Sequence, residues 1–119
     1  MKRILVADDD EDIVGLVEII LKSGGYTVQS TQNAQDIESL VKSYEPDLLL
    51  MDVYMPPYDT RSICKNLKKD DSFHTPVLLF SANMINPESL QDCHADGFLA
   101  KPFEITQLLH FVREGLVEK

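Results

Sequence analysis

Polar side chains that could perform chemistry follow short apolar runs at four places in this 119-residue chain. Acids follow two of the runs, a hydroxyl follows another and an ammonium follows the last; the side chains are Asp8, Asp9, Asp52, Ser81 and Lys101. Clustered carboxylates repel one another, and their hard oxygen atoms suit Mg2+ or Mn2+. A carboxylate can also attack phosphorus, while a metal ion, a lysine and a hydroxyl offset the phosphoryl charge.

The elements that must position these side chains alternate along the chain. Apolar runs predict strands at 4–7, 47–51, 76–80 and 98–100, and residues 26–30 have strand character. Helical patterns follow each strand, at 13–21, at 34–44, after the turn-rich residues 55–59 to about 67, from Asn86 to Gly97, and at 105–116. Such alternation indicates a parallel sheet covered on both faces, in which ligands bind at the carboxyl ends of the strands. We therefore expect the five polar side chains to converge on one edge.

Composition excludes several classes of protein. The chain has 11 basic and 20 acidic residues, for a net charge of −9, so direct binding of nucleic acid is not expected. Cys64 and Cys93 form no metal-like pattern and suit a reducing compartment. No signal sequence or membrane span is apparent, and we expect one cytoplasmic domain over residues 1–119. Asp10, Glu11 and Asp12 are interpreted as the acidic start of a helix.

Four motifs, in order and at these spacings, resemble those of a known family. ILVADD, LLLMDVYMP, LLFSAN and GFLAKPF together look like the receiver domain of two-component response regulators, and the likeness spans essentially the whole chain. The resemblance is to single-domain regulators like those of chemotaxis, and it implies a doubly wound (βα)5 flavodoxin-like α/β fold with a five-stranded parallel sheet in the order 2-1-3-4-5. A single-domain regulator and a piece of a longer protein both stay open, with the ending at Lys119 favouring the former slightly.

The same resemblance implies roles for individual residues. It makes Asp52 the phosphoacceptor, Asp9 a direct ligand of Mg2+ and Asp8 a ligand through water, with the backbone carbonyl of Tyr54 as a further ligand. Ser81 and Lys101 would contact the phosphoryl group. Phe98 would be an aromatic switch residue that moves with Ser81, the peptide bond before Pro102 would be cis, and the residues flanking the phosphoryl group would be Tyr54, Ala82 and Asn83.

Two residues near Asp52 depart from or elaborate the family pattern. Thr60 stands where a glycine is usual, which predicts an altered loop backbone, although we expect Thr60 to touch no ligand of the site. Tyr54 is bulky, and our hypothesis is that it restricts attacking water and lengthens the life of the phosphorylated state.

The resemblance implies a signalling module and not a stand-alone enzyme. A sensor histidine kinase or a histidine phosphotransfer protein would supply the phosphoryl group, and the surface of the fourth helix, fifth strand and fifth helix would then favour a downstream protein target. The domain would be a monomer or a weak dimer through that surface. One alternative is a degenerate receiver that binds partners without phosphorylation. Another is a haloacid-dehalogenase-type phosphatase, which would need an acid where Tyr54 stands.

Overall fold

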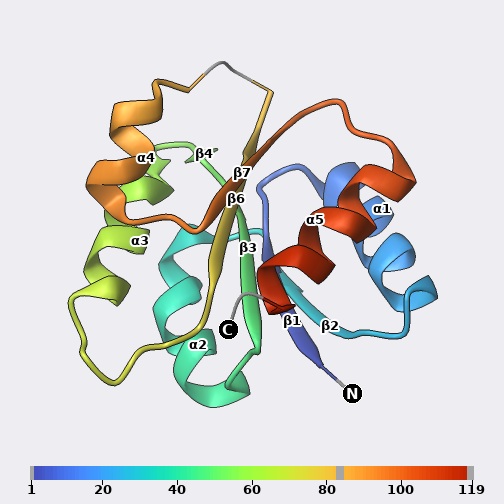
Figure 1. Ribbon diagram of the computed structural model, residues 1–119, viewed down its shortest axis with the longest axis horizontal. Helices are drawn as coiled ribbons and strands as arrows, with labels where there is room; N and C mark the ends of the chain where they lie inside the picture. The colour runs from blue at the N-terminus through green and yellow to red at the C-terminus, as the bar shows by residue number, and fades with distance from the viewer. Residues whose placement is uncertain (1, 83–84, 118–119) are drawn as a thin grey trace.

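The computed structural model describes residues 2–82 and 85–117 and has a central sheet between two layers of helices (Figure 1). The sheet is parallel and has five strands in the order β2-β1-β3-β6-β7, which confirms the predicted fold and strand order. These strands are β1 (Arg3–Ala7), β2 (Thr27–Thr31), β3 (Leu48–Asp52), β6 (Val77–Ser81) and β7 (Gly97–Ala100).

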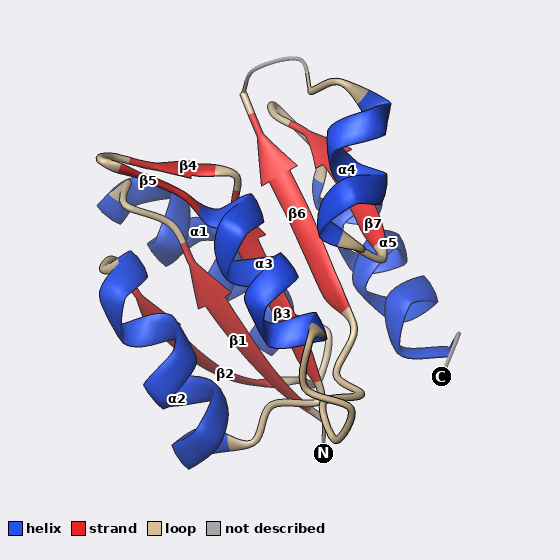
Figure 2. Ribbon diagram, turned by 90° about the vertical axis from the view of Figure 1, so that its left-hand side faces the viewer, coloured by secondary structure: helices blue, strands red, loops and turns tan. Residues whose placement is uncertain are grey.

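Helices cover both faces of the sheet. One face carries α1 (Glu11–Ser23) and α5 (Ile105–Val117), and the other carries η1 (Ala34–Asp36), α2 (Ile37–Tyr44), α3 (Thr60–Lys68) and α4 (Pro87–Cys93) (Figure 2). Successive strand residues point to opposite faces. Accordingly Leu50 and Phe80 pack with α1 and α5, while Met51 and Leu79 pack with α2, α3 and α4. No helix in the described ranges has the length and apolar character needed to cross a bilayer.

Several helix ends follow from local chemistry. Asp10 caps α1, since its carboxylate accepts hydrogen bonds from the amides of Asp12 and Ile13. Glu45 ends α2 in the left-handed conformation, with φ 52°, and Pro46 then prevents the helix from continuing. Asn86 caps α4, as its position before Pro87 predicts.

Several element boundaries differ from the prediction. The helix expected to reach Gly97 ends at Cys93, because His94 adopts the left-handed conformation with φ 62° and its amide bonds back to the last turn. Gly97 instead opens β7. Asp52 and Ser81 are the last residues of their strands and do not follow them, since the ladder continues beyond the apolar run.

The turn-rich residues after Asp52 form a small antiparallel hairpin. Its strands are β4 (Tyr54–Met55) and β5 (Tyr58–Asp59), joined through Pro56 and Pro57. Met55 is buried, whereas Tyr54 and both prolines are exposed. The hairpin leads directly into α3, where Asp59 caps the helix by accepting from the amide of Arg61. It therefore lies next to the last residue of β3.

Candidate functional site

Three carboxylates converge at the carboxyl edge of the sheet. Asp8 and Asp9 follow β1, Asp52 ends β3, and the pairing of Ala7 with Met51 sets these strand ends side by side. Carboxylate oxygens of the three residues all lie within 4.8 Å of one another. Asp8 is fully buried and Asp52 nearly so, whereas Asp9 is exposed. The cluster is thus open to solvent on the side of Asp9.

One ammonium group spans the two buried carboxylates. Lys101 Nζ lies 2.7 Å from Asp8 Oδ2 and 3.0 Å from Asp52 Oδ2, and it stands 4.5 Å from the ring centroid of Phe80. The amide of Lys101 donates to the carbonyl of Ser81 at 2.8 Å, which continues the β6–β7 ladder to this point. The Lys101–Pro102 peptide bond is cis. When Asp8, Asp9 and Asp52 are ionised and Lys101 is protonated, the cluster has a net charge of −2.

The remaining oxygens of the buried carboxylates are held by main-chain donors. Asp8 Oδ1 accepts from the amide of Asp10 at 2.9 Å, and Asp52 Oδ1 accepts from the amide of Tyr54 at 3.2 Å. The positions of both carboxylates are therefore set by the backbone on one side and by Lys101 on the other.

The electrostatics of the cluster reflect crowding of like charge. Burial raises the pKa of the Asp52 carboxyl and the charge of Asp8 raises it further, against the lowering effect of Lys101 and the Tyr54 amide. Burial and the neighbouring Asp8 likewise raise the pKa of Asp9. Burial by itself lowers the pKa of Lys101, but its hydrogen bonds to Asp8 and Asp52 outweigh that effect and leave it raised. Added positive charge would therefore be favourable here.

These donors fit a small divalent cation. Hard carboxylate oxygens in a partly exposed cluster are the ligands that Mg2+ and Mn2+ prefer, and Mg2+ commonly keeps several of its waters. The surplus of two negative charges matches such an ion. Asp9 offers an exposed carboxylate for direct ligation, and Asp52 offers a partly buried one.

The other predicted site residues lie around this edge. Ser81 is buried at the end of β6, the strand that pairs with β3, and Ala82 beyond it is exposed. Phe98 is half-buried in β7 opposite Leu79 and packs against the apolar cluster of the α2–α4 face. Asn83, expected to flank the phosphoryl group, lies outside the described residues.

The contacts of Thr60 differ from the expectation. Among the described residues other than glycine, only Glu45 and His94 have positive φ, so the first residue of α3 places no demand for glycine at this position. Thr60 is also fully buried, and its hydroxyl donates to the main-chain carbonyl of Asp52 at 2.5 Å. The expectation that Thr60 touches no ligand of the site was therefore wrong, because it considered only the missing glycine and not the hydroxyl.

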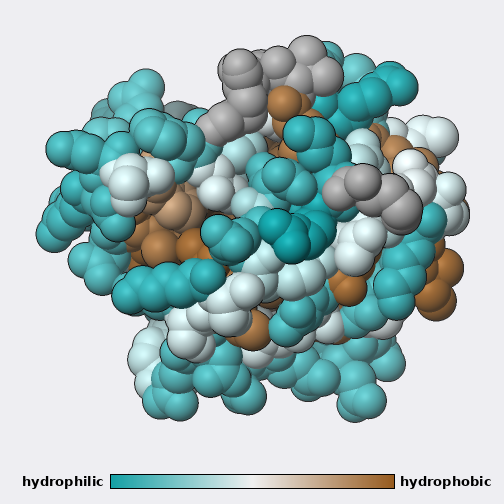
Figure 3. Space-filling model, turned by 90° about the horizontal axis from the view of Figure 1, so that it is seen from below, coloured by the Kyte–Doolittle hydropathy of each residue, from teal (hydrophilic) through white to brown (hydrophobic). Residues whose placement is uncertain are grey.

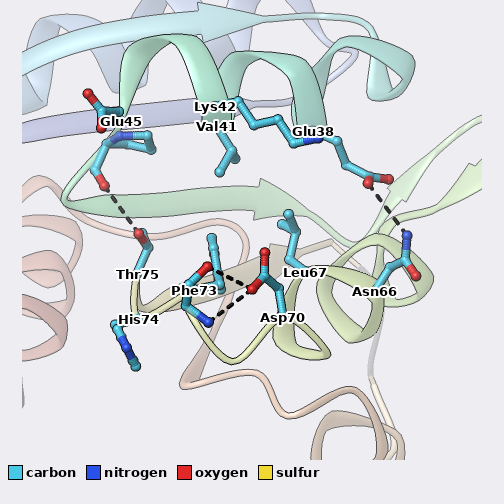
Figure 4. A pocket seen from close by; sticks show the side chains of 12 residues that line it. Glu38, Val41, Lys42, Glu45, Asn66, Leu67, Asp70, Phe73, His74 and Thr75 are labelled. Carbon is cyan, nitrogen blue, oxygen red and sulfur yellow. Dashed lines mark hydrogen bonds between the residues drawn. The ribbon is translucent and has the colours of Figure 1, made fainter.

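A separate hollow of about 460 Å³ lies away from this edge, between α2 and the connection from α3 to β6. Viewed from below, the molecule shows a hydrophobic patch bordered by hydrophilic residues on the side where α2 and α3 lie (Figure 3). Val41, Leu67 and Phe73 line the hollow, and acids and Lys42 surround them (Figure 4). Its lining includes none of the three clustered acids, so our candidate functional site is the cluster at the carboxyl edge and not this hollow.

Proteins with related sequences and similar structures include response regulators. The chain is 35% identical over 116 residues to the DNA-binding dual master transcriptional regulator RpaA of Synechocystis sp., covering 95% of this chain and 48% of that protein. It therefore spans about half of the length of this curated relative. Similar solved structures include the chemotaxis protein CheY4 of Vibrio cholerae, with a TM-score of 0.89, 25% identity and 98% and 99% of the two chains covered.

Two further solved structures and a family model also match this chain. The receiver domain of the Francisella response regulator 1452 has a TM-score of 0.88 and 27% identity, with 99% and 98% of the chains covered. A response regulator receiver domain from Bermanella marisrubri has a TM-score of 0.84 and 28% identity, with 97% of each chain covered. The family model described as the response regulator receiver domain matches residues 4–113. The chain belongs to the response regulator receiver domain family of two-component signalling.

Proposed function

We propose that this receiver domain accepts a phosphoryl group on Asp52 in the presence of Mg2+ or Mn2+. The observation that carries the proposal is the cluster of Asp8, Asp9 and Asp52, in which the ammonium of Lys101 pairs with Asp8 and Asp52. Asp9, Asp52 and the carbonyl of Tyr54 would hold the cation directly, and Asp8 through water. The cation would supply positive charge that offsets the charge of the transferring phosphoryl group.

The transfer uses a carboxylate oxygen of Asp52 as nucleophile. This oxygen attacks the phosphorus of a phosphohistidine; a P–O bond forms as the P–N bond breaks, and its electron pair returns to the imidazole nitrogen. The Tyr54 amide and Lys101 already hold the two carboxylate oxygens in place. Dephosphorylation ends the signal: water attacks the phosphorus of the aspartyl phosphate, inorganic phosphate is released and the Asp52 carboxylate is restored. The domain catalyses only these changes on itself and is not a stand-alone enzyme.

Phosphorylation replaces the single negative charge of the Asp52 carboxylate with about two negative charges on a phosphoryl group, beside Lys101 and Ser81. Lys101, which now pairs with Asp8 and Asp52, would pair with the phosphoryl oxygens, and Ser81 would turn its hydroxyl toward them. Phe98 would follow inward and change the surface of α4, β7 and α5. The equilibrium between two states of this surface would thus be biased by one phosphoryl group.

The partners follow from this chemistry. A sensor histidine kinase or a histidine phosphotransfer protein would present the phosphohistidine, and a downstream protein would bind the altered surface, all in the cytoplasm. One curated relative is named as DNA-binding, but this chain corresponds to 48% of it. With a net charge of −9, this chain is proposed to bind protein and not nucleic acid, as a monomer or weak dimer.

The proposal is tested by intact-mass spectrometry after incubation with acetyl phosphate. We expect the wild type to gain the mass of one phosphoryl group with Mg2+ and none in excess chelator, and Asp52→Asn to gain none. Asp96→Asn, which removes an acid remote from the cluster, should be labelled like wild type. No labelling of wild type under any condition would overturn the proposal and favour a binding module that works without phosphorylation.

A further inference from the structure

The buried hydroxyl of Thr60 contacts the main chain of Asp52, the proposed phosphoacceptor. Thr60, the first residue of α3, is fully buried. Its Oγ1 lies 2.5 Å from the main-chain oxygen of Asp52 and 3.2 Å from that of Val53. Its amide also donates to the carbonyl of Val53, at 2.8 Å. Three short contacts thus join the start of α3 to the last residue of β3 and its successor.

The Thr60 hydroxyl is not an ordinary helix cap. A capping side chain accepts hydrogen bonds from amides in the first turn. Asp59 does this at α3, where its carboxylate accepts from the amide of Arg61 at 3.0 Å. The Thr60 hydroxyl instead donates backwards, out of the helix and onto the strand end. Capping of α3 therefore does not explain its position.

These contacts close the loop that carries Tyr54. Val53 is held from the other side, since its amide donates to the carbonyl of Phe80 at 2.9 Å. With Thr60 fixing the carbonyls of Asp52 and Val53, the chain enters the hairpin at Tyr54 from a defined position. The amide of Tyr54 then reaches Asp52 Oδ1. If the Thr60 side chain moved, the carbonyls of Asp52 and Val53 would lose its hydroxyl as a hydrogen-bond partner, and Tyr54, the next residue, would be displaced with them.

We propose that the Thr60 hydroxyl is a positioning residue for cation binding and phosphoryl acceptance at Asp52. It acts by fixing the main chain of Asp52 and Val53, and so the placement of the Asp52 carboxylate and the Tyr54 carbonyl. This inference rests on the proposed function of the same site. The family that the sequence resembles usually has glycine at this position, and glycine has no hydroxyl that could donate such a hydrogen bond.

The test compares variants that keep or remove the hydroxyl. Thr60→Val is nearly isosteric and lacks the donor, whereas Thr60→Ser keeps it. Ser62→Ala is a matched control, because Ser62 also donates a hydroxyl to a main-chain carbonyl at the start of α3, that of Asp59, but is exposed and does not touch Asp52. Mg2+ binding is measured by calorimetry and acetyl phosphate labelling by intact mass.

If the hydroxyl positions the site, we expect Thr60→Val to bind Mg2+ about fivefold to tenfold more weakly, a loss comparable in size with one hydrogen bond of ordinary strength. Labelling should then need correspondingly more Mg2+. At saturating Mg2+, the acetyl phosphate dependence should approach that of wild type, because the nucleophile itself is intact. Thr60→Ser should stay within about twofold of wild type, since its hydroxyl donates as before. Ser62→Ala should match wild type.

The outcomes separate this inference from the function on which it rests. If wild type binds no Mg2+ and takes no label, the proposed function fails. If wild type does both and Thr60→Val is unchanged, or if Thr60→Ser is as impaired as Thr60→Val, the role of the hydroxyl is refuted. Should Thr60→Val not fold, Thr60→Ala against Thr60→Ser makes the same comparison without placing a methyl group where the hydroxyl was.

Discussion

The two edges of the central sheet carry polar clusters with different charge balance. At the carboxyl edge, the carboxylates of Asp8, Asp9 and Asp52 lie close together, and the ammonium of Lys101 pairs with those of Asp8 and Asp52. At the amino edge, Asp96 Oδ2 accepts from Lys68 Nζ and from the amide of Val77, each at 2.7 Å. The amino-edge pair is neutral and ties the end of α3 to the start of β6. The carboxyl-edge cluster has surplus negative charge, which is why we propose that it binds a cation, whereas the amino-edge pair is a structural contact.

Removing the lysine at each edge gives the largest expected contrast. Lys101→Met leaves the fully buried Asp8 and the nearly buried Asp52 without a counter-charge, and we expect a loss of about 3 kcal/mol in unfolding free energy. Lys68→Met should cost about 1 kcal/mol or less, since Asp96 is more than a third exposed. Urea unfolding in chelator measures both. Equal losses would contradict the distinction.

Adding Mg2+ should stabilise only proteins with an intact carboxyl-edge cluster. At about ten times the dissociation constant, we expect wild type and Asp96→Asn to gain about 1.4 kcal/mol in unfolding free energy. Asp9→Asn should gain little, because it loses the exposed carboxylate of the cluster. The measurement is urea unfolding with and without Mg2+. A full gain in Asp9→Asn would remove Asp9 from the proposed ligands.

The raised pKa of Asp52 predicts a pH dependence without metal. The folded state binds the Asp52 proton more tightly than the unfolded state does, so its contribution to stability falls as the pH rises from about 4 through the raised pKa. In chelator, wild type should therefore lose stability relative to Asp52→Asn between acid and neutral pH. A relative gain by wild type would show that ion pairing with Lys101 outweighs burial.

The smallest expected effect concerns Tyr54, which is half exposed beside the carboxyl-edge cluster. If its ring restricts attacking water, Tyr54→Ala should shorten the life of the phosphorylated protein about twofold, corresponding to roughly 0.4 kcal/mol. Decay of the phosphorylated mass after removal of acetyl phosphate measures this. Tyr58→Ala, on the same hairpin but bonded to Gln35, is the control. Equal or slower decay in Tyr54→Ala would reject the hypothesis.

Much of the fold was predictable because the three central strands of the sheet, β1, β3 and β6, are buried on both faces. Continuous apolar runs identified the sheet, and the polar residues at their ends identified the edge that gathers Asp8, Asp9, Asp52 and Lys101. Periodicity could not locate the ends of strands, since backbone hydrogen bonding continues past the apolar run to Asp52. The short hairpin after Asp52 has too few residues to show a period.

Two features depended on backbone and side-chain contacts that a sequence pattern does not record. His94 ends α4 in the left-handed conformation although Gly97 is the residue suited to it, because the chain must turn there to enter β7. The hydroxyl of Thr60 reaches Asp52 only because the hairpin returns the chain to the strand end. The threonine that replaces the usual glycine was the available signal in the sequence, because its hydroxyl can donate a hydrogen bond.

Paramagnetic broadening by Mn2+ in amide NMR spectra tests the central claim most directly. Substoichiometric Mn2+ should broaden the amides of residues 8–10 and 52–54 first, while those around Asp96 and Val77 at the amino edge keep their intensity. Asp9→Asn should need much more Mn2+ for the same effect. Broadening centred on the amino edge, or equal at both edges, would contradict the assignment of the charged carboxyl edge as the cation and phosphoryl site.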